Sequence, residues 1–399
     1  MKITFFSLLI AIFISPTLSY GMSFDALCNH VYNASGEIIQ TNGLLLSNTH
    51  EKASALASEP LMFEGSTSAI KGKDSLDTGM YYKGMLNFKL KKPAFQEAKS
   101  DQFDQNTKIL YQEIQLQQKL IQVGLKHGWL ISMLENERIV VLREKVASTK
   151  EAYVIGAKKV NAGRMSQMEL MRFQTETHNA DQELAIGEME FQHAQHGLQE
   201  SAMLDETIIV DDLSFAFIAD DNRTENRIND SRVLHMINAQ ITALDAQIKS
   251  AGFEGSEFLI IGAGATHQPS QDSIDVTINI PITWGEKNDR KLAALMSTRS
   301  ALLHRHDVTK QKLQMNIHTL LEHLESREKR LKEAIVVEKE QKKLMGMAQK
   351  GYEGGVVSQF EFLATKNSYF DTRLRTIELK REYIQEMSAM EEKLGGIWK

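Results

Sequence analysis

Residues 351–363 read Gly-Tyr-Glu-Gly-Gly-Val-Val-Ser-Gln-Phe-Glu-Phe-Leu, and this stretch separates two long segments with helical periodicity. Gly354 and Gly355 let the backbone leave a helix and reverse, because glycine adopts a positive φ that other residues avoid. Ser358 precedes Glu361 by three residues, which is the spacing of a capping box at the start of a new helix. The stretch therefore predicts the tight tip of a helical hairpin.

The same arrangement occurs earlier in the chain, with Gly163, Ser166 and Glu169 at equivalent positions. The offset between the two glycines is 355 − 163 = 192 residues. The same offset aligns the apolar residues of one alternating segment with those of another, namely Leu86, Phe88 and Leu90 with Ile278, Ile280 and Ile282. A match held over about eighty residues without a net insertion predicts an internal duplication.

Composition restricts the class of protein. The chain has 399 residues but only five prolines and no low-complexity linker, which favours one continuous architecture. A net charge of −6 without a basic cluster argues against a nucleic-acid partner. Cys28 is the single cysteine, so an internal disulfide framework and a multi-cysteine metal site are excluded.

The N-terminus has the pattern of a secretory signal peptide. Lys2 precedes an apolar run over residues 3–14, and small residues follow, so we expect residues 1–21 to be removed, with cleavage after Ser19 or Gly21. Leu27 stands before Cys28 where a lipoprotein signal has a small residue, which favours an unmodified cysteine over a lipidated one. No later apolar run reaches the roughly 20 residues of a membrane-spanning helix, so a membrane role would depend on strands.

The clearest strand pattern lies at residues 274–283. Apolar Ile274, Val276 and Ile278 alternate with polar residues, and Trp284 follows at a position suited to a membrane interface. The length is about the nine to eleven residues that a tilted strand needs to cross a bilayer. A sandwich strand with one buried face is the alternative interpretation.

Two very long helical segments follow the strand patterns. Seam residues of the first segment recur at alternating steps of four and three, at Leu116, Leu120, Val123, His127, Leu130, Leu134, Glu137 and Val141. Residues of the second segment keep the same heptad phase, at Leu313, Ile317, Leu320, Leu324 and Leu331. Nothing interrupts the first segment between Pro93 and Gly163, which predicts a helix of roughly 100 Å that needs partner helices.

The predicted organisation is a first repeat over residues 22–203 and a second over residues 226–399, joined by an acidic linker over residues 204–225. The expected strands are 60–70, 80–91, 252–266 and 274–283. The expected long helices are 93–161, 166–203, 286–350 and 358–394. Shorter helices are expected over 22–58, with breaks near Gly36 and Gly43, and over 226–251.

Each repeat thus reads helix, strand, turn, strand, very long helix, glycine tip and return helix. This order, the Ile-Asn-Ile-Pro-Ile-Thr-Trp-Gly of residues 278–285 and the Gly-x-x-Ser-x-x-Glu of both tips resemble the TolC-like outer-membrane efflux protein family. The resemblance covers nearly the whole mature chain. The tip motif alone is weak, but the duplication and the layout together are specific.

The resemblance implies a mainly α-helical chain with a β-barrel portion. Three copies would pool their duplicated strand pairs into one 12-stranded barrel, continued by a coiled-coil tunnel across the periplasm. The polar face of the last strand would line the lumen, with Asp275, Thr277 and Asn279. Four strands cannot close a barrel, and open edges in lipid leave backbone groups unpaired, which is a physical reason to expect a homotrimer.

The resemblance also implies the role of an exit duct in a tripartite efflux or type I secretion system. Such a duct lies in outer-membrane lipid and works with a periplasmic adaptor and an inner-membrane pump. The adaptor would dock on Gly163, Arg164, Met165 and Ser166 and on Gly355, Val356, Val357 and Ser358. Exposed Met165, Val356 and Val357 would favour a covered surface over an unbound turn.

Glu169 and Glu361 have two interpretations. Each could cap the helix that begins at Ser166 or Ser358. The resemblance also implies that acidic residues past the second tip ring the closed periplasmic mouth. Glu361 matches the first such position but Ala364 occupies the second, so a double carboxylate gate is not expected.

No Walker loop, HExxH, GxSxG or CxxC motif is present, so an enzyme is the least expected class, and neither a cofactor nor a metal is expected. His193 and His196, like His304 and His306, are expected to be solvated. Methionines at seam-like positions are expected to fill the core and not to bind soft metals, at Met133, Met168, Met189 and Met315.

Two other functions fit parts of the sequence. A periplasmic adaptor also has a long helical hairpin, but one hairpin between flanking β-domains, whereas this chain predicts two hairpins, each preceded by a strand pair. A secreted coiled-coil filament does not explain the amphipathic strands.

Overall fold

The computed structural model describes residues 21–71, 79–210, 212–217, 225–269, 271–281 and 286–396. The expected signal segment, apart from Gly21, and Trp284 lie outside these ranges. The described chain is mainly helical with a small sheet, which confirms that part of the predicted fold class. None of the helices in these ranges combines the length and the apolar character needed to cross a membrane.

The chain divides into two compact units. Unit 1 contains Met1–Val31, Gly124–Phe217 and Arg327–Gln385, and unit 2 contains Tyr32–Val123, Ile218–Ser326 and Glu386–Lys399. Each unit therefore includes segments of both predicted repeats. The cause is the length of α3 (Pro93–Asn161) and α6 (Glu286–Glu353), each of which contributes residues to both units.

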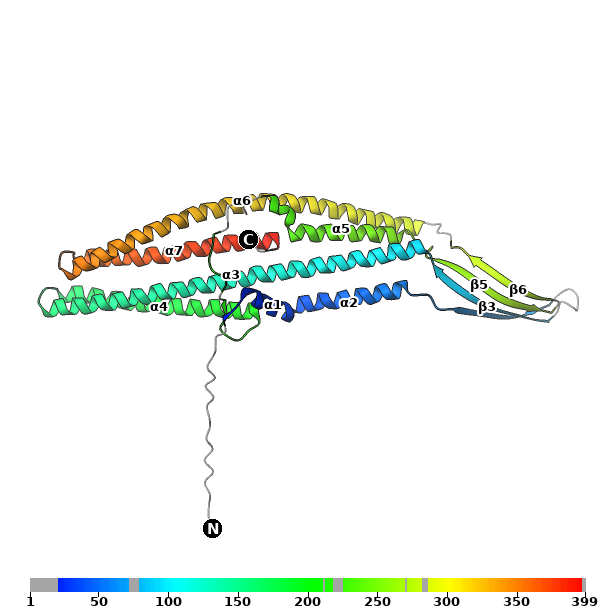
Figure 1. Ribbon diagram of the computed structural model, residues 1–399, viewed down its shortest axis with the longest axis horizontal. Coiled ribbons are helices and arrows are strands. Elements are labelled where there is room, and N and C mark those ends of the chain that lie inside the picture. The colour runs from blue at the N-terminus through cyan, green and yellow to red at the C-terminus, as the bar shows by residue number, and fades with distance from the viewer. Residues whose placement is uncertain are drawn as a thin grey trace, which may run out of the picture. The chain divides into compact units, whose positions relative to one another are not determined.

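Unit 2 holds a four-stranded antiparallel sheet (Figure 1). Its strands are β2 (Met62–Ile70), β3 (Gly79–Lys91), β5 (Phe258–Gln268) and β6 (Gln271–Asn279), in the order β2-β3-β5-β6. The central pairing joins the two repeats, with Met85 opposite Gly264 and Asn87 opposite Gly262. A Cβ at Gly264 would lie 2.9 Å from the Cα of Met85, so glycine permits the close approach of β3 and β5.

Several element boundaries differ from the expected ones. β6 ends at Asn279, two residues before Pro281, whose missing N–H cannot join a strand ladder. Residues 252–255 form turns, and β5 begins only at Phe258. Gly43 does not break a helix: α1 (Phe24–Ala34) ends before Ser35, and α2 (Gly36–Leu56) continues through Gly43. A helix interior tolerates glycine at a cost of about 1 kcal/mol.

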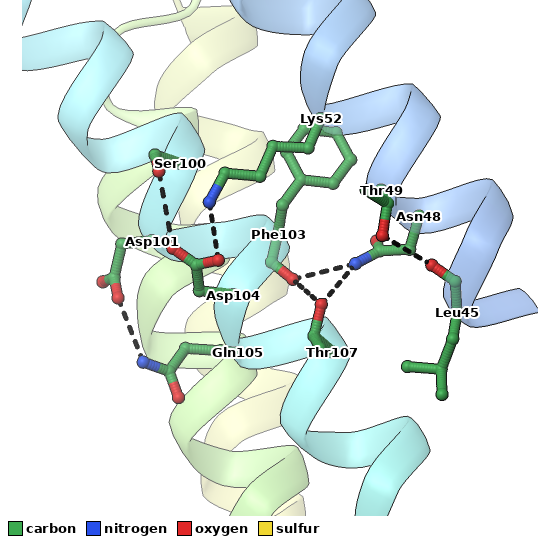
Figure 2. A network of polar contacts seen from close by, with 10 residues as sticks. All are labelled: Leu45, Asn48, Thr49, Lys52, Ser100, Asp101, Phe103, Asp104, Gln105 and Thr107. Atoms are coloured by element: carbon green, nitrogen blue, oxygen red, sulfur yellow. Dashed lines mark hydrogen bonds and ion pairs between the residues drawn. The ribbon is translucent and has the colours of Figure 1, made fainter.

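The helices of unit 2 pack through both apolar and polar contacts. Figure 2 shows Asn48 of α2 donating hydrogen bonds to the carbonyl oxygen of Phe103 (2.9 Å) and to the hydroxyl of Thr107 (2.8 Å) on α3. One turn further along α2, Lys52 pairs with Asp104 at 2.6 Å. Between residues 225 and 251 the chain forms a short 3-10 helix (Glu225–Asp230) and then α5 (Arg232–Ala251).

Unit 1 consists mainly of two helical hairpins, in which α4 (Gln167–Ala202) returns along α3 and α7 (Gln359–Leu394) returns along α6 (Figure 1). Ion pairs cross from α3 to α7, since Glu137 pairs with Lys380 at 2.8 Å and Glu144 pairs with Arg373. These charges sit beside buried leucines in the same helices, so the seam between the two hairpins is partly ionic.

The part of the expected linker that the structure describes is tied to the helices of unit 1. β4 (Ile209–Val210) pairs in parallel with β1 (Gly21–Met22). The indole N–H of Trp129 donates to the carbonyl oxygen of Leu213 at 2.9 Å, and Phe217 packs edge-to-face on Tyr383 of α7. The described residues of the linker are therefore held against the helices of unit 1.

Candidate functional site

The two hairpin ends have the same backbone geometry. At the first tip (residues 162–166) Gly163 has φ +67°, and the N–H of Arg164 donates to the carbonyl oxygen of Lys159 at 2.8 Å. At the second tip (residues 354–358) Gly355 has φ +78°, and the N–H of Val356 donates to Gly351 at 2.8 Å. A left-handed glycine with this bond is a common way to end a helix.

The cap at the first tip is a complete capping box. The N–H of Glu169 donates to the hydroxyl of Ser166 at 3.2 Å, and the Glu169 carboxylate accepts from the N–H of Ser166 at 2.8 Å. This hydrogen bond to the backbone of Ser166 lowers the pKa of Glu169 below its ordinary value. The capping interpretation of Glu169 is thus confirmed.

At the second tip only one of the two hydrogen bonds of a capping box is present. The N–H of Glu361 donates to the hydroxyl of Ser358 at 3.2 Å, but within the described chain the Glu361 carboxylate makes no return bond to Ser358. Glu361 is exposed, whereas Glu169 is half-buried. Of the two acidic residues, Glu361 therefore has the carboxylate that is not used by its own helix.

The two tips are joined to one another inside unit 1. Lys159, in the last turn of α3, donates to the carbonyl oxygen of Tyr352 at 2.6 Å, and its ammonium lies 3.6 Å from the Tyr352 ring centroid. On the other side, the amide of Gln359 donates to the carbonyl oxygen of Glu169 at 2.7 Å. Burial lowers the pKa of Lys159, and burial together with the nearby Glu169 raises the pKa of Tyr352.

An aromatic cluster underlies both tips, with Phe173 of α4, Tyr352 of α6 and Phe362 of α7 as its large members and Ala152 and Ala348 between them. Tyr352 stacks on Phe362 with ring centroids 4.8 Å apart and planes at 2°. The cluster therefore joins residues from four helices.

The expectation that three apolar tip residues are exposed is wrong for two of them. Met165 and Val357 are half-buried and pack against the aromatic cluster. Of the three residues, Val356 alone is almost fully exposed, at 88%. Both residues follow the left-handed glycine of their tip by two positions, where the side chain packs against the cluster.

A groove of about 640 Å³ lies between α4 and α7 beside the tips. Its apolar lining includes Met168 (64% exposed), Met171 and Phe360 (75% exposed), and its polar lining includes Glu176 and Asn367. The expectation that Met168, Met189 and Met315 fill the core is wrong, since all three are more than half exposed; Met133 is half-buried. His193, His196 and His304 are exposed, and His306 is half-buried beside Asp307.

The two faces of the sheet differ in the way the alternation predicts. Ile274, Val276 and Ile278 are exposed on one face, with Ile274 at 86%. On the opposite face Asp275 accepts a hydrogen bond from Thr266, and Thr277 contacts the sulfur of Met85 at 3.7 Å. Asn279, at the end of β6, is exposed. A buried Asn87, bonded to Glu64 at 3.2 Å, continues this polar face across β3 and β2.

Sequence reasoning missed the residues that connect the tips. Lys159, Tyr352 and Gln359 carry no motif of their own. The available signal was the duplication, because the repeats place Lys159 and Gly351, and likewise Gln167 and Gln359, at equivalent positions. That signal identifies partner positions but not the contacts between them.

Comparisons with known proteins support the fold. No protein-family model matches the chain, and no curated protein does. A solved structure of CusC, described in connection with transmembrane channel formation, is 15% identical, with a TM-score of 0.69 over 95% of this chain and 94% of that one. The outer membrane protein VceC of Vibrio cholerae is 12% identical, with a TM-score of 0.68 over 94% of this chain and 97% of that one.

The open state of the MtrE outer membrane channel of Neisseria gonorrhoeae also matches, at 12% identity and a TM-score of 0.66, over 94% of this chain and 89% of that one. Structural matches at sequence identities this low show a shared fold, but they do not show shared functional residues. The chain therefore has the fold of the TolC-like outer-membrane efflux proteins, as its duplicated strand pairs and hairpin tips predict.

Proposed function

We propose that this chain is the outer-membrane exit duct of a tripartite efflux or type I secretion system. The observation that carries the proposal is the sheet of unit 2. One face presents large apolar side chains to the outside, and the other carries hydrogen-bonded polar groups. In lipid, the first face suits acyl chains and the second suits a water-filled lumen.

The sheet edges support a homotrimer. In the described chain the order β2-β3-β5-β6 leaves β2 and β6 each with one neighbour. An edge of unpaired N–H and C=O groups is costly in hydrocarbon, and pairing of β6 with β2 of a second copy removes that cost. Three copies would supply the 12 strands of a closed barrel, with Asp275 and Thr277 facing its interior.

The tips support contact with a periplasmic adaptor. The side chain of Val356 is almost fully exposed, and an apolar groove lies directly beside the tips. The eight tip residues from Gly163 to Ser166 and from Gly355 to Ser358 would form the docking surface. Glu361, with its carboxylate free of the cap, would face the closed periplasmic mouth. Cargo would move passively, with an inner-membrane pump as the source of energy.

Cysteine labelling tests the channel directly. In a Cys28→Ser background, Thr277→Cys should react with a membrane-impermeant maleimide in purified, reconstituted protein and should then reduce conductance. The matched variant Val276→Cys occupies the adjacent position on the opposite face and should resist that reagent but react with a lipid-soluble one. Recovery of the chain as a monomer outside the outer-membrane fraction would contradict the proposal.

A further inference from the structure

Lys366 of α7 is a buried amine that the function proposed above does not use. Its side chain is 0% exposed, and within the described chain its Nζ has no hydrogen-bond partner. Burial of an ammonium is costly unless it is paired, and structural lysines at such depth normally have a carboxylate beside them. An unpaired lysine in a packed helical bundle therefore calls for a physical explanation.

Two charged groups from neighbouring helices act on Lys366. Glu176 of α4 attracts its ammonium, and Lys145 of α3 repels it. Lys145 is itself paired with Glu183 at 2.7 Å, so it has a carboxylate of its own. Glu176 is half-buried, lines the groove between α4 and α7, and has no hydrogen bond or ion pair in the described chain.

In the described chain no carboxylate lies within hydrogen-bonding distance of the Nζ of Lys366, and acidic groups on α3, α6 and α7 pair with other cations. On α7, Phe362 one turn before it stacks on Tyr352 of α6. Asp371 lies 4.0 Å from Lys145, and Arg373 is paired with Glu144 of α3 and lies 3.9 Å from Glu338 of α6. Each of these acidic groups already faces another cation.

We propose that Lys366 is a pH-dependent switch in the packing of α4 against α7. The neutral amine favours the packed arrangement of unit 1. The protonated amine favours a rearranged state in which Lys366 reaches the carboxylate of Glu176 at the groove. The packing change concerns unit 1 alone, and only its consequence for flow rests on the proposed channel function.

The direction of the pH effect follows from the charge. Burial lowers the pKa of Lys366 from 10.5 to about 8, and Lys145 acts in the same direction while Glu176 opposes it. Since the rearranged state binds the proton more tightly, the packed state gains stability as the pH rises from about 8 toward 10.5. Between pH 7 and pH 9.5 the rearranged population should fall on the order of tenfold.

Hydrogen exchange of the full chain in detergent tests the switch. After correction for the intrinsic pH dependence of exchange, peptides over residues 359–370 and 167–177 should exchange faster at pH 7 than at pH 9.5. Lys366→Met should exchange slowly at both pH values, because a neutral side chain of similar length keeps the packed state. Lys339→Met, which removes an exposed lysine from α6 of the same unit, is the matched control and should behave as the wild type.

Glu176→Gln gives a second measurement that leaves Lys366 in place. Loss of the carboxylate removes the partner of the rearranged state, so corrected exchange at pH 7 should fall toward the level of Lys366→Met. Equal exchange of wild type and Lys366→Met at pH 7 would overturn the switch. Conductance of the reconstituted protein tests the channel proposal independently. If exchange depends on pH as described but the protein conducts no ions, the packing switch stands and the proposed channel function is contradicted.

Discussion

The ammonium of Lys159 lies 3.6 Å from the ring centroid of Tyr352 and also donates a 2.6 Å hydrogen bond to the carbonyl oxygen of the same residue. Lys159 comes from the end of α3, and Tyr352 comes from the end of α6. One side chain thus satisfies a C-terminal carbonyl of the other hairpin and covers an aromatic face. The contact joins the ends of two helices that are 193 residues apart in the chain.

Replacement of Lys159 should loosen the two tips. Lys159→Met removes a hydrogen bond and a cation–π contact, so the free energy of unfolding of unit 1 should fall by about 1–2 kcal/mol. Hydrogen exchange over residues 348–360 should report the change, with a lower unfolding midpoint in urea. Lys158→Met is the control, because Lys158 lies in the same last turn but is exposed. Equal effects of the two variants would show that only the charge near the helix end matters.

The two capping serines should differ in their contribution. Ser166→Ala removes a complete capping box and should cost about 1 kcal/mol of unfolding free energy. Ser358→Ala removes one hydrogen bond, because the Glu361 carboxylate does not return to the backbone, and should cost less. Chemical denaturation of the two variants side by side would measure the difference. A larger loss from Ser358→Ala would contradict the described geometry.

Acid should weaken the first cap. Because the pKa of Glu169 is lowered in the folded chain, its contribution is complete above its ordinary value of 4.5 and is lost as the pH falls through the lowered pKa. The stability difference between wild type and Glu169→Gln should therefore shrink as the pH falls below about 4.5. Denaturation series from pH 3 to pH 7 test this, with Glu361→Gln as the matched variant.

Methionine oxidation should map the exposed face of α4. Dilute peroxide should oxidise Met168 and Met171 of the groove faster than Met387 and Met390, which are at most 4% exposed. Peptide mass spectrometry measures each rate. If an adaptor docks at the tips, its addition should protect Met168 and Met171, whereas Met315 in unit 2 should keep its rate. Rapid oxidation of Met390 would show that the packing around this part of α7, which belongs to unit 2, is open.

A side chain at Gly264 should disrupt the sheet. A Cβ there overlaps the carbonyl oxygen of Gly84 on β3, so Gly264→Ala should lower the free energy of unfolding by about 1–3 kcal/mol. The neighbouring Ala265→Val adds volume on the opposite, exposed face and should be close to neutral. Thermal unfolding followed by the β-sheet signal in circular dichroism would compare the two variants.

The tip residues Gly163 and Gly355 illustrate what local chemistry makes predictable. A positive φ excludes most residues, and serine followed three positions later by glutamate satisfies the first N–H groups of a helix wherever it occurs. These requirements are local, so they can be recognised from one short stretch of sequence. The strand alternation at Ile274, Val276 and Ile278 is legible for the same reason.

Met168, Gly43 and Lys366 illustrate what periodicity does not reveal. Met168 lies at a seam-like position but is exposed beside the groove, because a helix in a bundle has partners on some sides only. Gly43 lies inside a continuous helix, because packing of α2 on α3 outweighs its poor propensity. Lys366 has the charge of a surface residue but is fully buried, with Lys145 of α3 and Glu176 of α4 as the charged groups that act on it.

The sequence by itself determined the duplication, the helical hairpins with their tips and the two faces of the strands, since each depends on residues close together in the chain. The tertiary structure alone decided which side of each helix is covered, how Lys159 and Gln359 join the tips, and where charges such as Lys366 are buried. Those properties depend on contacts between residues far apart in the chain, such as Glu137 and Lys380, which are 243 positions apart, and no local pattern encodes them.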